Sequence, residues 1–226
     1  MKRRGYLSAV ATTSAVATAG CLYGVPVIGS ETVLDAPEID LSAASHPSHG
    51  DELPTLSFPD PLLGEVVSTE RFEGERALLL TFIYTNCPDG MCPALTLRLR
   101  RAQEIATADG YSDDAAFLAT TFDPERDTAD VLRNYATERG IDLDAGNWHF
   151  LRPESYEEGV ETLEGKFGLV IEKAESEVYD DLEYVFPHYN LILLVNDRGI
   201  VERAYPNGAT VDIDRVITDF KAVVSA

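Results

Sequence analysis

The sequence contains few basic residues and few cysteines. Against 39 aspartates and glutamates it has only 18 lysines and arginines, so the formal net charge of its 226 residues is -21. A surface of this sign repels nucleic acid and anionic lipid, and we expect neither as a binding partner. Only three cysteines occur, at positions 21, 87 and 92, and the chain has no internal repeat. Any thiol chemistry must therefore use these positions.

The acidity does not indicate a disordered chain. The hydrophobic fraction is 45%, and the negative charges are spread between regular apolar segments, unlike those of a disordered acidic tail. This length and composition predict one domain with a tail. The charge suits a surface that stays hydrated in concentrated salt, as in an extreme halophile, although an unusually acidic secreted protein would also carry it.

The first 20 residues, MKRRGYLSAVATTSAVATAG, differ in composition from the rest. Their only charges are Lys2, Arg3 and Arg4, and a mildly apolar stretch that ends in small residues follows. The arginine pair resembles a twin-arginine signal, and ATAGC resembles a lipobox in which Cys21 becomes the lipidated first residue. The stretch is too rich in Thr and Ser for a membrane span, which needs about 20 strongly apolar residues. We predict a lipoprotein export signal at 1–20, with a buried or frayed N-terminal helix as the alternative.

Residues 21–52 lack any sustained period and carry Pro, Gly, Ser and Asp throughout. This composition is typical of a flexible tether, here between a lipid anchor and a folded domain. His46 and His49 could bind a divalent metal weakly, but the neighbouring proline and glycine argue against a rigid helical pair. We expect both histidines to lie in a solvated loop.

From residue 53 to 226 the pattern is that of an α/β domain. The predicted elements, in order, are a strand at 77–84, a helix from Pro93 to about Gly110, a strand at 115–122, a helix from Asp127 to Gly140, a strand at 148–151, a helix from Pro153, a hairpin at 189–205 that turns at Asp197–Gly199, and a last helix from about Asp212. Successive strand–helix units predict parallel pairing, and the hairpin adds antiparallel strands. The order is similar to the thioredoxin-like fold, a central mixed sheet flanked by helices.

The stretch CPDGMCPAL places Cys87 and Cys92 on either side of a turn, directly after the buried strand ALLLTFIY. We expect Cys87 to end the strand and Cys92 to be the N-cap of the next helix, with Pro93 as its first residue. Ligands gather at this edge of an open α/β sheet. The positive helix end favours the thiolate of Cys92, so we expect its pKa to be lowered.

Two kinds of chemistry fit a cysteine pair in this turn. One is a reversible disulfide, and the other is a two-thiolate clamp for Cu(I), to which an imidazole can add a third ligand. A structural disulfide is less favoured, because closing so short a loop stabilises little. His188 directly precedes an apolar strand, in a loop that the fold could place at the same edge of the sheet, and is therefore a candidate third ligand.

Three ordered motifs then resemble one family. The stretches FIYTNCPDGMCPALT, TFDPERDT and FPHYNLILLVNDRGIV are similar to the SCO/SenC family of copper-binding thioredoxin-fold proteins, across roughly residues 53–226. The resemblance implies copper ligation by Cys87, Cys92 and His188, and assistance in assembling the dinuclear copper centre in subunit II of cytochrome c oxidase. Two features depart from the family pattern. Four residues separate the cysteines, one more than is usual, and Pro187 stands where an Asp often precedes the histidine.

Other residues near these motifs carry weaker signals. His149 lies in a predicted strand and is a weaker candidate ligand than His188. Met91 could offer a thioether, but such a residue more often covers apolar surface. Asp123–Arg126 could border the site, or could form the turn that leads to a helix capped by Asp127.

These observations predict an exported, lipid-anchored domain that binds one copper ion and delivers it, or an electron pair, to the copper site of a membrane cytochrome oxidase. Transfer would proceed by ligand exchange with the cysteines of the partner. The alternative is an enzyme, a thiol-disulfide oxidoreductase in which Cys87 and Cys92 are the redox pair. Peroxide reduction is less favoured, because the threonine and arginine that it normally needs cannot be placed.

Overall fold

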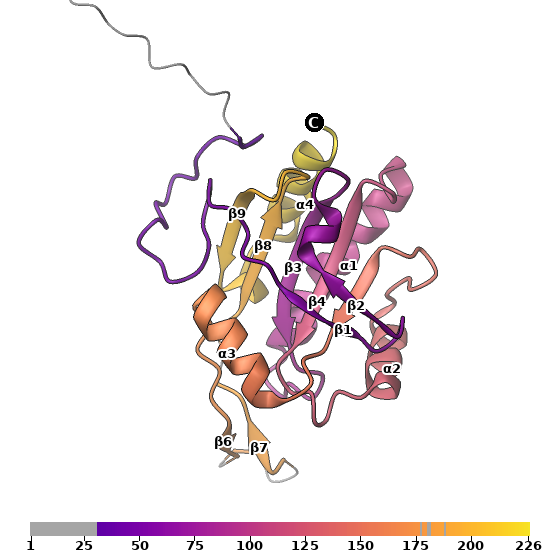
Figure 1. Ribbon diagram of the computed structural model, residues 1–226, viewed down its shortest axis with the longest axis vertical. Helices are drawn as coiled ribbons and strands as arrows, with labels where there is room; N and C mark the ends of the chain where they lie inside the picture. The colour runs from indigo at the N-terminus through magenta and orange to yellow at the C-terminus, as the bar shows by residue number, and fades with distance from the viewer. Residues whose placement is uncertain (1–30, 177, 180–181, 188) are drawn as a thin grey trace, which may run out of the picture.

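The computed structural model describes residues 31–176, 178–179, 182–187 and 189–226. The predicted export signal, the predicted lipid-anchor residue Cys21 and the candidate ligand His188 lie outside these residues. A five-stranded sheet runs through the centre of the domain, in the order β5-β4-β3-β8-β9 (Figure 1). Within the described residues, no helix is both long enough and apolar enough to cross a membrane.

The middle of the sheet consists of fully apolar runs. β3 (Ala77–Ile83) and β4 (Ala115–Thr121) are buried along their whole length and pair in parallel. β5 (Trp148–Leu151) adds a parallel strand beyond β4. On the other side, β8 (Leu191–Val195) pairs antiparallel with β3, and β9 (Val201–Pro206) pairs antiparallel with β8. The sheet is therefore mixed, and the expected thioredoxin-like architecture is confirmed.

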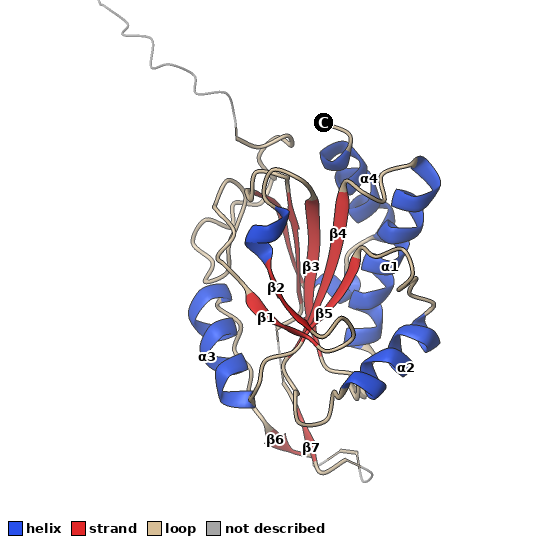
Figure 2. Cartoon of the chain, turned by 45° about the vertical axis from the view of Figure 1, so that its right-hand side comes forward, coloured by secondary structure: helices blue, strands red, loops and turns tan. Residues whose placement is uncertain are grey.

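Helices cover both faces of the sheet. α1 (Met91–Asp109), α2 (Ala129–Arg139) and α4 (Ile213–Val224) lie on one face, and α3 (Tyr156–Phe167) lies on the other (Figure 2). Apolar residues at helical spacing supply the contacts with the sheet. Those that are fully buried include Leu95, Leu99, Ala102 and Ala106 of α1, Leu163 and Phe167 of α3, and Val216 and Phe220 of α4.

Two short hairpins complete the fold. β1 (Ser57–Asp60) pairs with β2 (Glu65–Ser68) and contacts β5. β6 (Ala174–Glu175) pairs with β7 (Tyr184–Val185), at one end of the domain in Figure 1. The sequence did not predict the β6–β7 hairpin, because strands of two residues are too short to display a period.

The start of α1 differs from the expectation. Gly90 is the N-cap residue, with a φ of 79°, and Met91 is the first helical residue. Cys92 and Pro93 are therefore the second and third residues of α1, and their predicted positions as N-cap and first residue were wrong. A glycine accepts the left-handed conformation without strain, which allows the turn to reverse tightly before the helix begins. The helix ends at Gly110, as predicted.

The start of α2 also requires a correction. Thr128 is its N-cap, and the Thr128 hydroxyl accepts a hydrogen bond from the backbone N–H of Val131 at 3.4 Å. Asp127, which the sequence predicted as the cap, is fully buried. A carboxylate in that position must find partners elsewhere. Gly140 ends the helix, as predicted.

Residues 31–52 lie against β9, in contrast to the free tether expected from their composition. Glu52 forms an antiparallel bridge with Ile200, next to the start of β9. The fully buried carboxylate of Glu202 accepts two backbone N–H groups, from residues 33 and 34, at 2.7 and 2.9 Å. Figure 1 shows this segment along the outer side of β9. Because it pairs mainly through its backbone, its side chains show no period in the sequence.

The two histidines of this segment are not solvated as expected. His46 is only 7% exposed, and its ring stacks on that of Tyr189 with the centroids 5.9 Å apart. His49 is half-buried, and its Nδ1 atom lies 3.0 Å from the carbonyl oxygen of Glu202. Both histidines therefore help to hold the segment on the domain.

Candidate metal and redox site

The two cysteines lie on the turn that leads from the C-terminal end of β3 into α1. Tyr84 continues the buried run of β3, and the chain then leaves the sheet at Thr85. Apart from its neighbours in the chain, no described atom lies within 4 Å of the position that a Cβ at Gly90 would occupy. The turn therefore faces open space at Gly90.

Each sulfur receives a backbone amide. Cys87 Sγ accepts from the N–H of Cys92 at 3.3 Å, and Cys92 Sγ accepts from the N–H of Tyr84 at 3.4 Å. The Cys87 thiol donates to Asp89 Oδ1 at 2.8 Å, and the same oxygen accepts the N–H of Met91 at 2.9 Å. The turn thus brings the two thiols into hydrogen-bond contact with each other. Two sulfur donors in this arrangement can hold a soft metal ion or join as a disulfide.

The two cysteines differ in burial. Cys92 is fully buried, whereas Cys87 is partly exposed. Burial raises the pKa of the Cys92 thiol well above its ordinary value, and the hydrogen bond and charge of Cys87 raise it further. The predicted lowering of this pKa was wrong. Removal of the sulfur from water outweighs the favourable dipole of the helix end.

Asp127 holds the end of β3 just before the cysteine turn. Its carboxylate accepts the backbone N–H of Thr85 at 3.1 Å, and it also accepts the hydroxyls of Thr85 and Thr121. Burial raises the pKa of Asp127 to about 6, although the hydrogen bonds from Thr121 and Thr85 oppose the rise. Because Thr85 lies two residues before Cys87, Asp127 fixes the point where the turn leaves the strand. Sequence reasoning missed this role, because it assigned Asp127 to the cap of the following helix.

Aromatic rings join the cysteine side of the site to the segment after β6. The ring centroid of Tyr84 lies 5.1 Å from that of Phe186 and 5.4 Å from that of Phe122. Phe186 also contacts the ring of Tyr184 at 5.4 Å, and the Tyr184 hydroxyl donates to Asp123 Oδ1 at 2.9 Å. Tyr184 of β7 and Phe186 just after it are therefore packed toward the end of β3, which leads into the cysteine turn.

The remaining candidate residues are placed as follows. His149 is buried in β5, where its Nδ1 atom lies 3.5 Å from Asp60 Oδ2 and its ring packs on Phe72, away from the cysteines. Met91 is half-buried and packs on the hydrophobic core, as expected for a residue that covers apolar surface. In the part of the chain that the structure describes, no three side chains of His, Cys, Asp or Glu gather around a potential metal position.

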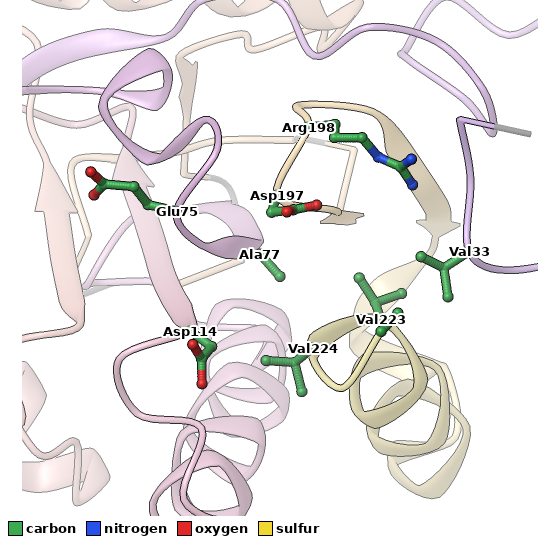
Figure 3. Close-up of a pocket in the computed structure, with 9 residues that line it drawn as sticks. Val33, Glu75, Ala77, Asp114, Asp197, Arg198, Val223 and Val224 are labelled. Carbon is green, nitrogen blue, oxygen red and sulfur yellow. The ribbon is translucent and has the colours of Figure 1, made fainter. Parts of the chain in front are cut away.

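A cavity at the opposite end of β3 differs in chemistry from the cysteine turn. Figure 3 shows it between the start of β3 and the end of α4, with Asp114, Asp197 and Arg198 among the residues that line it. Among the residues that the structure describes, no cysteine or histidine lines the cavity. Its oxygen donors are hard ligands, so a soft metal ion would prefer the sulfur pair.

Known proteins resemble this chain over most of its folded domain. The SCO1/SenC family model matches residues 62–225. An SCO2-like protein of Rickettsia prowazekii (strain Madrid E) is 26% identical over 138 residues, which is 60% of this chain and 60% of that protein. The chain thus matches about 60% of the length of this curated relative.

Solved structures extend the comparison to most of the domain. One of them is BsSco, which is described as a member of the Sco family of cytochrome c oxidase assembly proteins with a disulfide switch. BsSco is 26% identical in sequence to this chain, and the two structures superpose with a TM-score of 0.61. The match covers 79% of this chain and 96% of BsSco. Arabidopsis thaliana ScoI, solved with copper bound, has a TM-score of 0.58 at 21% identity, over 79% of this chain and all of that one. At 21% identity, the similarity to ScoI shows only that the two proteins share a fold.

Proposed function

Because this chain belongs to the SCO1/SenC family, we propose that it is a copper-binding assembly factor, which delivers copper to the dinuclear copper site of a membrane cytochrome oxidase. The paired sulfurs carry the proposal. The N–H of Cys92 already lies 3.3 Å from Cys87 Sγ, so the turn needs little rearrangement to hold one ion. Thiolates select Cu(I), and copper-bound relatives support this cargo. His188, which lies in the stretch FPHYN, would be the third ligand.

The difference in burial between the two sulfurs sets the order in which they release copper during transfer. Binding of Cu(I) requires both thiols to release their protons, and the raised pKa of Cys92 means that its proton leaves only when copper replaces it. Cys87 is the sulfur that a partner can reach. A thiol of the partner loses its proton and forms a bond to copper as the bond to Cys87 breaks, and the released Cys87 thiolate takes up one proton. Cys92 is then the last ligand to release the ion.

Anaerobic titration with Cu(I) tests the clamp. The reduced wild-type protein should bind about one equivalent. Cys87→Ser and Cys92→Ser should each lose tight binding, because a hydroxyl is a poor ligand for Cu(I). Cys21→Ser is the matched control and should keep full stoichiometry. Equal binding by the wild type and Cys87→Ser would exclude the proposed clamp.

A thiol-disulfide oxidoreductase is the second candidate, and the hydrogen-bond contact between the two thiols favours it. In that reaction Cys87 attacks a disulfide of the partner and forms a mixed disulfide. Cys92 then displaces the partner as a dithiol, so that two electrons leave the pair and a Cys87–Cys92 disulfide remains. This chemistry does not require His188.

His188→Ala separates the two functions. A copper carrier should lose Cu(I) affinity and oxidase assembly in cells, because one of three ligands is gone. The Cys87–Cys92 pair should still be oxidised and reduced. His49→Ala is a control for the loss of an imidazole, since His49 lies against Glu202. Normal oxidase assembly with His188→Ala, together with failure with Cys87→Ser, would favour the oxidoreductase.

We also propose that the protein is exported and anchored at the outer face of the cell membrane through a lipid on Cys21. The twin-arginine pattern and the ATAGC stretch support this location. Replacing Arg3 and Arg4 by lysine should leave precursor inside the cell. Cys21→Ser should release the domain into the medium, and its retention on the membrane would exclude the lipid anchor.

A further inference from the structure

The loop between β4 and α2 contacts both segments that carry the proposed copper ligands. We call residues 123–127 the bracket loop. Its last residue, Asp127, binds Thr85 ahead of the cysteine turn, and its first residue, Asp123, binds Tyr184 ahead of position 188. We propose that the bracket loop positions the cysteine turn relative to the β6–β7 hairpin, so that copper affinity depends on both hydrogen bonds. This inference rests on the proposed function.

The contact with the cysteine turn is buried. Asp127 has no exposed surface, and it accepts both the backbone N–H and the hydroxyl of Thr85. Water cannot readily replace a donor that is lost at such a position, so removal of one leaves the carboxylate partly unsatisfied. Thr85 is thereby a positioning residue for Cys87, two residues further along the chain.

The contact with the hairpin uses three residues of the bracket loop. Asp123, which is 2% exposed, accepts the Tyr184 hydroxyl at 2.9 Å. The guanidinium carbon of Arg126 lies 4.1 Å from the centroid of the same ring. Lys173 Nζ lies 3.9 Å from that centroid and 3.2 Å from Glu125 Oε2. Tyr184 begins β7 and Lys173 directly precedes β6, so both strands of the hairpin are held.

The two contacts are joined by the short, closed backbone of the bracket loop. The N–H groups of Arg126 and Asp127 both donate to the carbonyl oxygen of Asp123, at 3.2 and 2.9 Å. A loop closed in this way cannot shift at one aspartate without moving the other. Loss of either side-chain contact should therefore alter the spacing between the cysteine turn and the hairpin.

Two matched substitutions test the inference. Thr85→Val and Tyr184→Phe each remove one hydroxyl donor from one aspartate of the bracket loop and keep the rest of the side chain. Tyr205→Phe is the control, because the Tyr205 hydroxyl donates to Asp219 at 2.8 Å, between β9 and α4. Each test variant should weaken Cu(I) binding about tenfold, the effect of one hydrogen bond to a charged group. Each should also shift the thiolate-to-Cu(II) absorption band, whereas the control should change neither.

The double variant measures the coupling. Because both hydrogen bonds act through one loop, the combined loss of affinity should be smaller than the product of the two single losses. A combined loss equal to that product would overturn the inference. So would a Tyr184→Phe protein that loses thermal stability as Tyr205→Phe does, yet keeps the copper affinity and absorption band of the wild type.

A separate readout distinguishes this inference from the proposed function. If the wild type binds no copper, the proposed function fails, but the rate at which iodoacetamide alkylates Cys87 still reports on the turn. That rate should rise in both Thr85→Val and Tyr184→Phe and stay unchanged in Tyr205→Phe. Unchanged rates in all three variants would refute the positioning role of the bracket loop.

Discussion

The buried carboxyl of Asp127 should make the folded protein less stable as the pH rises from about 4 to about 6. Burial raises its pKa from 3.8 to about 6, so the folded state holds this proton more tightly than the unfolded state does. The stabilisation is fully present below pH 3.8 and is lost as the pH rises through about 6. At about 1.4 kcal/mol per pKa unit, the shift corresponds to about 3 kcal/mol of unfolding free energy.

Urea unfolding of the wild type and of Asp127→Asn over this pH range measures the effect. Asparagine cannot ionise, so the unfolding free energy of the variant minus that of the wild type should grow by about 3 kcal/mol across the window. Titrations that both proteins share cancel in this difference. Asp130→Asn is the control, because the side chain of Asp130 is 89% exposed. The unfolding free energy of this variant minus that of the wild type should stay nearly constant over the same pH range. A constant difference for Asp127→Asn would refute the reasoning.

Two further predictions concern the segment that lies along β9. Gly168→Ala should lower the free energy of unfolding by more than about 1 kcal/mol in thermal or urea unfolding, because Gly168 has a φ of 62° and a Cβ there would lie 2.4 Å from Ser45 O. An unchanged stability would show that Ser45 yields without cost. Glu202→Gln should weaken the charge-assisted bonds to residues 33 and 34 by about 1–2 kcal/mol, and limited proteolysis should then cleave this segment faster than in the wild type.

Sequence reasoning could predict those elements of the fold whose apolar residues form a continuous run or a regular pattern. β3 and β4 are continuous apolar runs, and α1 shows helical spacing and a terminal glycine, so sequence reasoning placed them to within a few residues. The β6–β7 hairpin is too short to show a period. Residues 31–52 attach largely through backbone groups, which have no signature in the side-chain pattern.

The predictable part of the site is the cysteine turn itself. Its position after a buried strand and before a helix followed from the order of elements. The sign of the Cys92 pKa shift did not follow, because it depends on burial of the sulfur at the packed end of β3. The role of Asp127 was hidden for a similar reason. A polar residue beside a helix start is usually a cap, and only the packing shows that it faces inward.

The pairing of residues 50–53 with residues 199–201 also covers the beginning of the edge strand β9. The N–H of Gly50 donates to Val201 O at 2.9 Å, and the N–H of Val201 donates to Asp51 O at the same distance. An uncovered edge strand offers its free amides and carbonyls to the edge of another molecule, which is a common start of aggregation. A shortened protein that begins at residue 54 should therefore self-associate, as light scattering would reveal. If the proposed lipid anchor gathers many copies on one membrane, this segment would also keep neighbouring copies from pairing through β9.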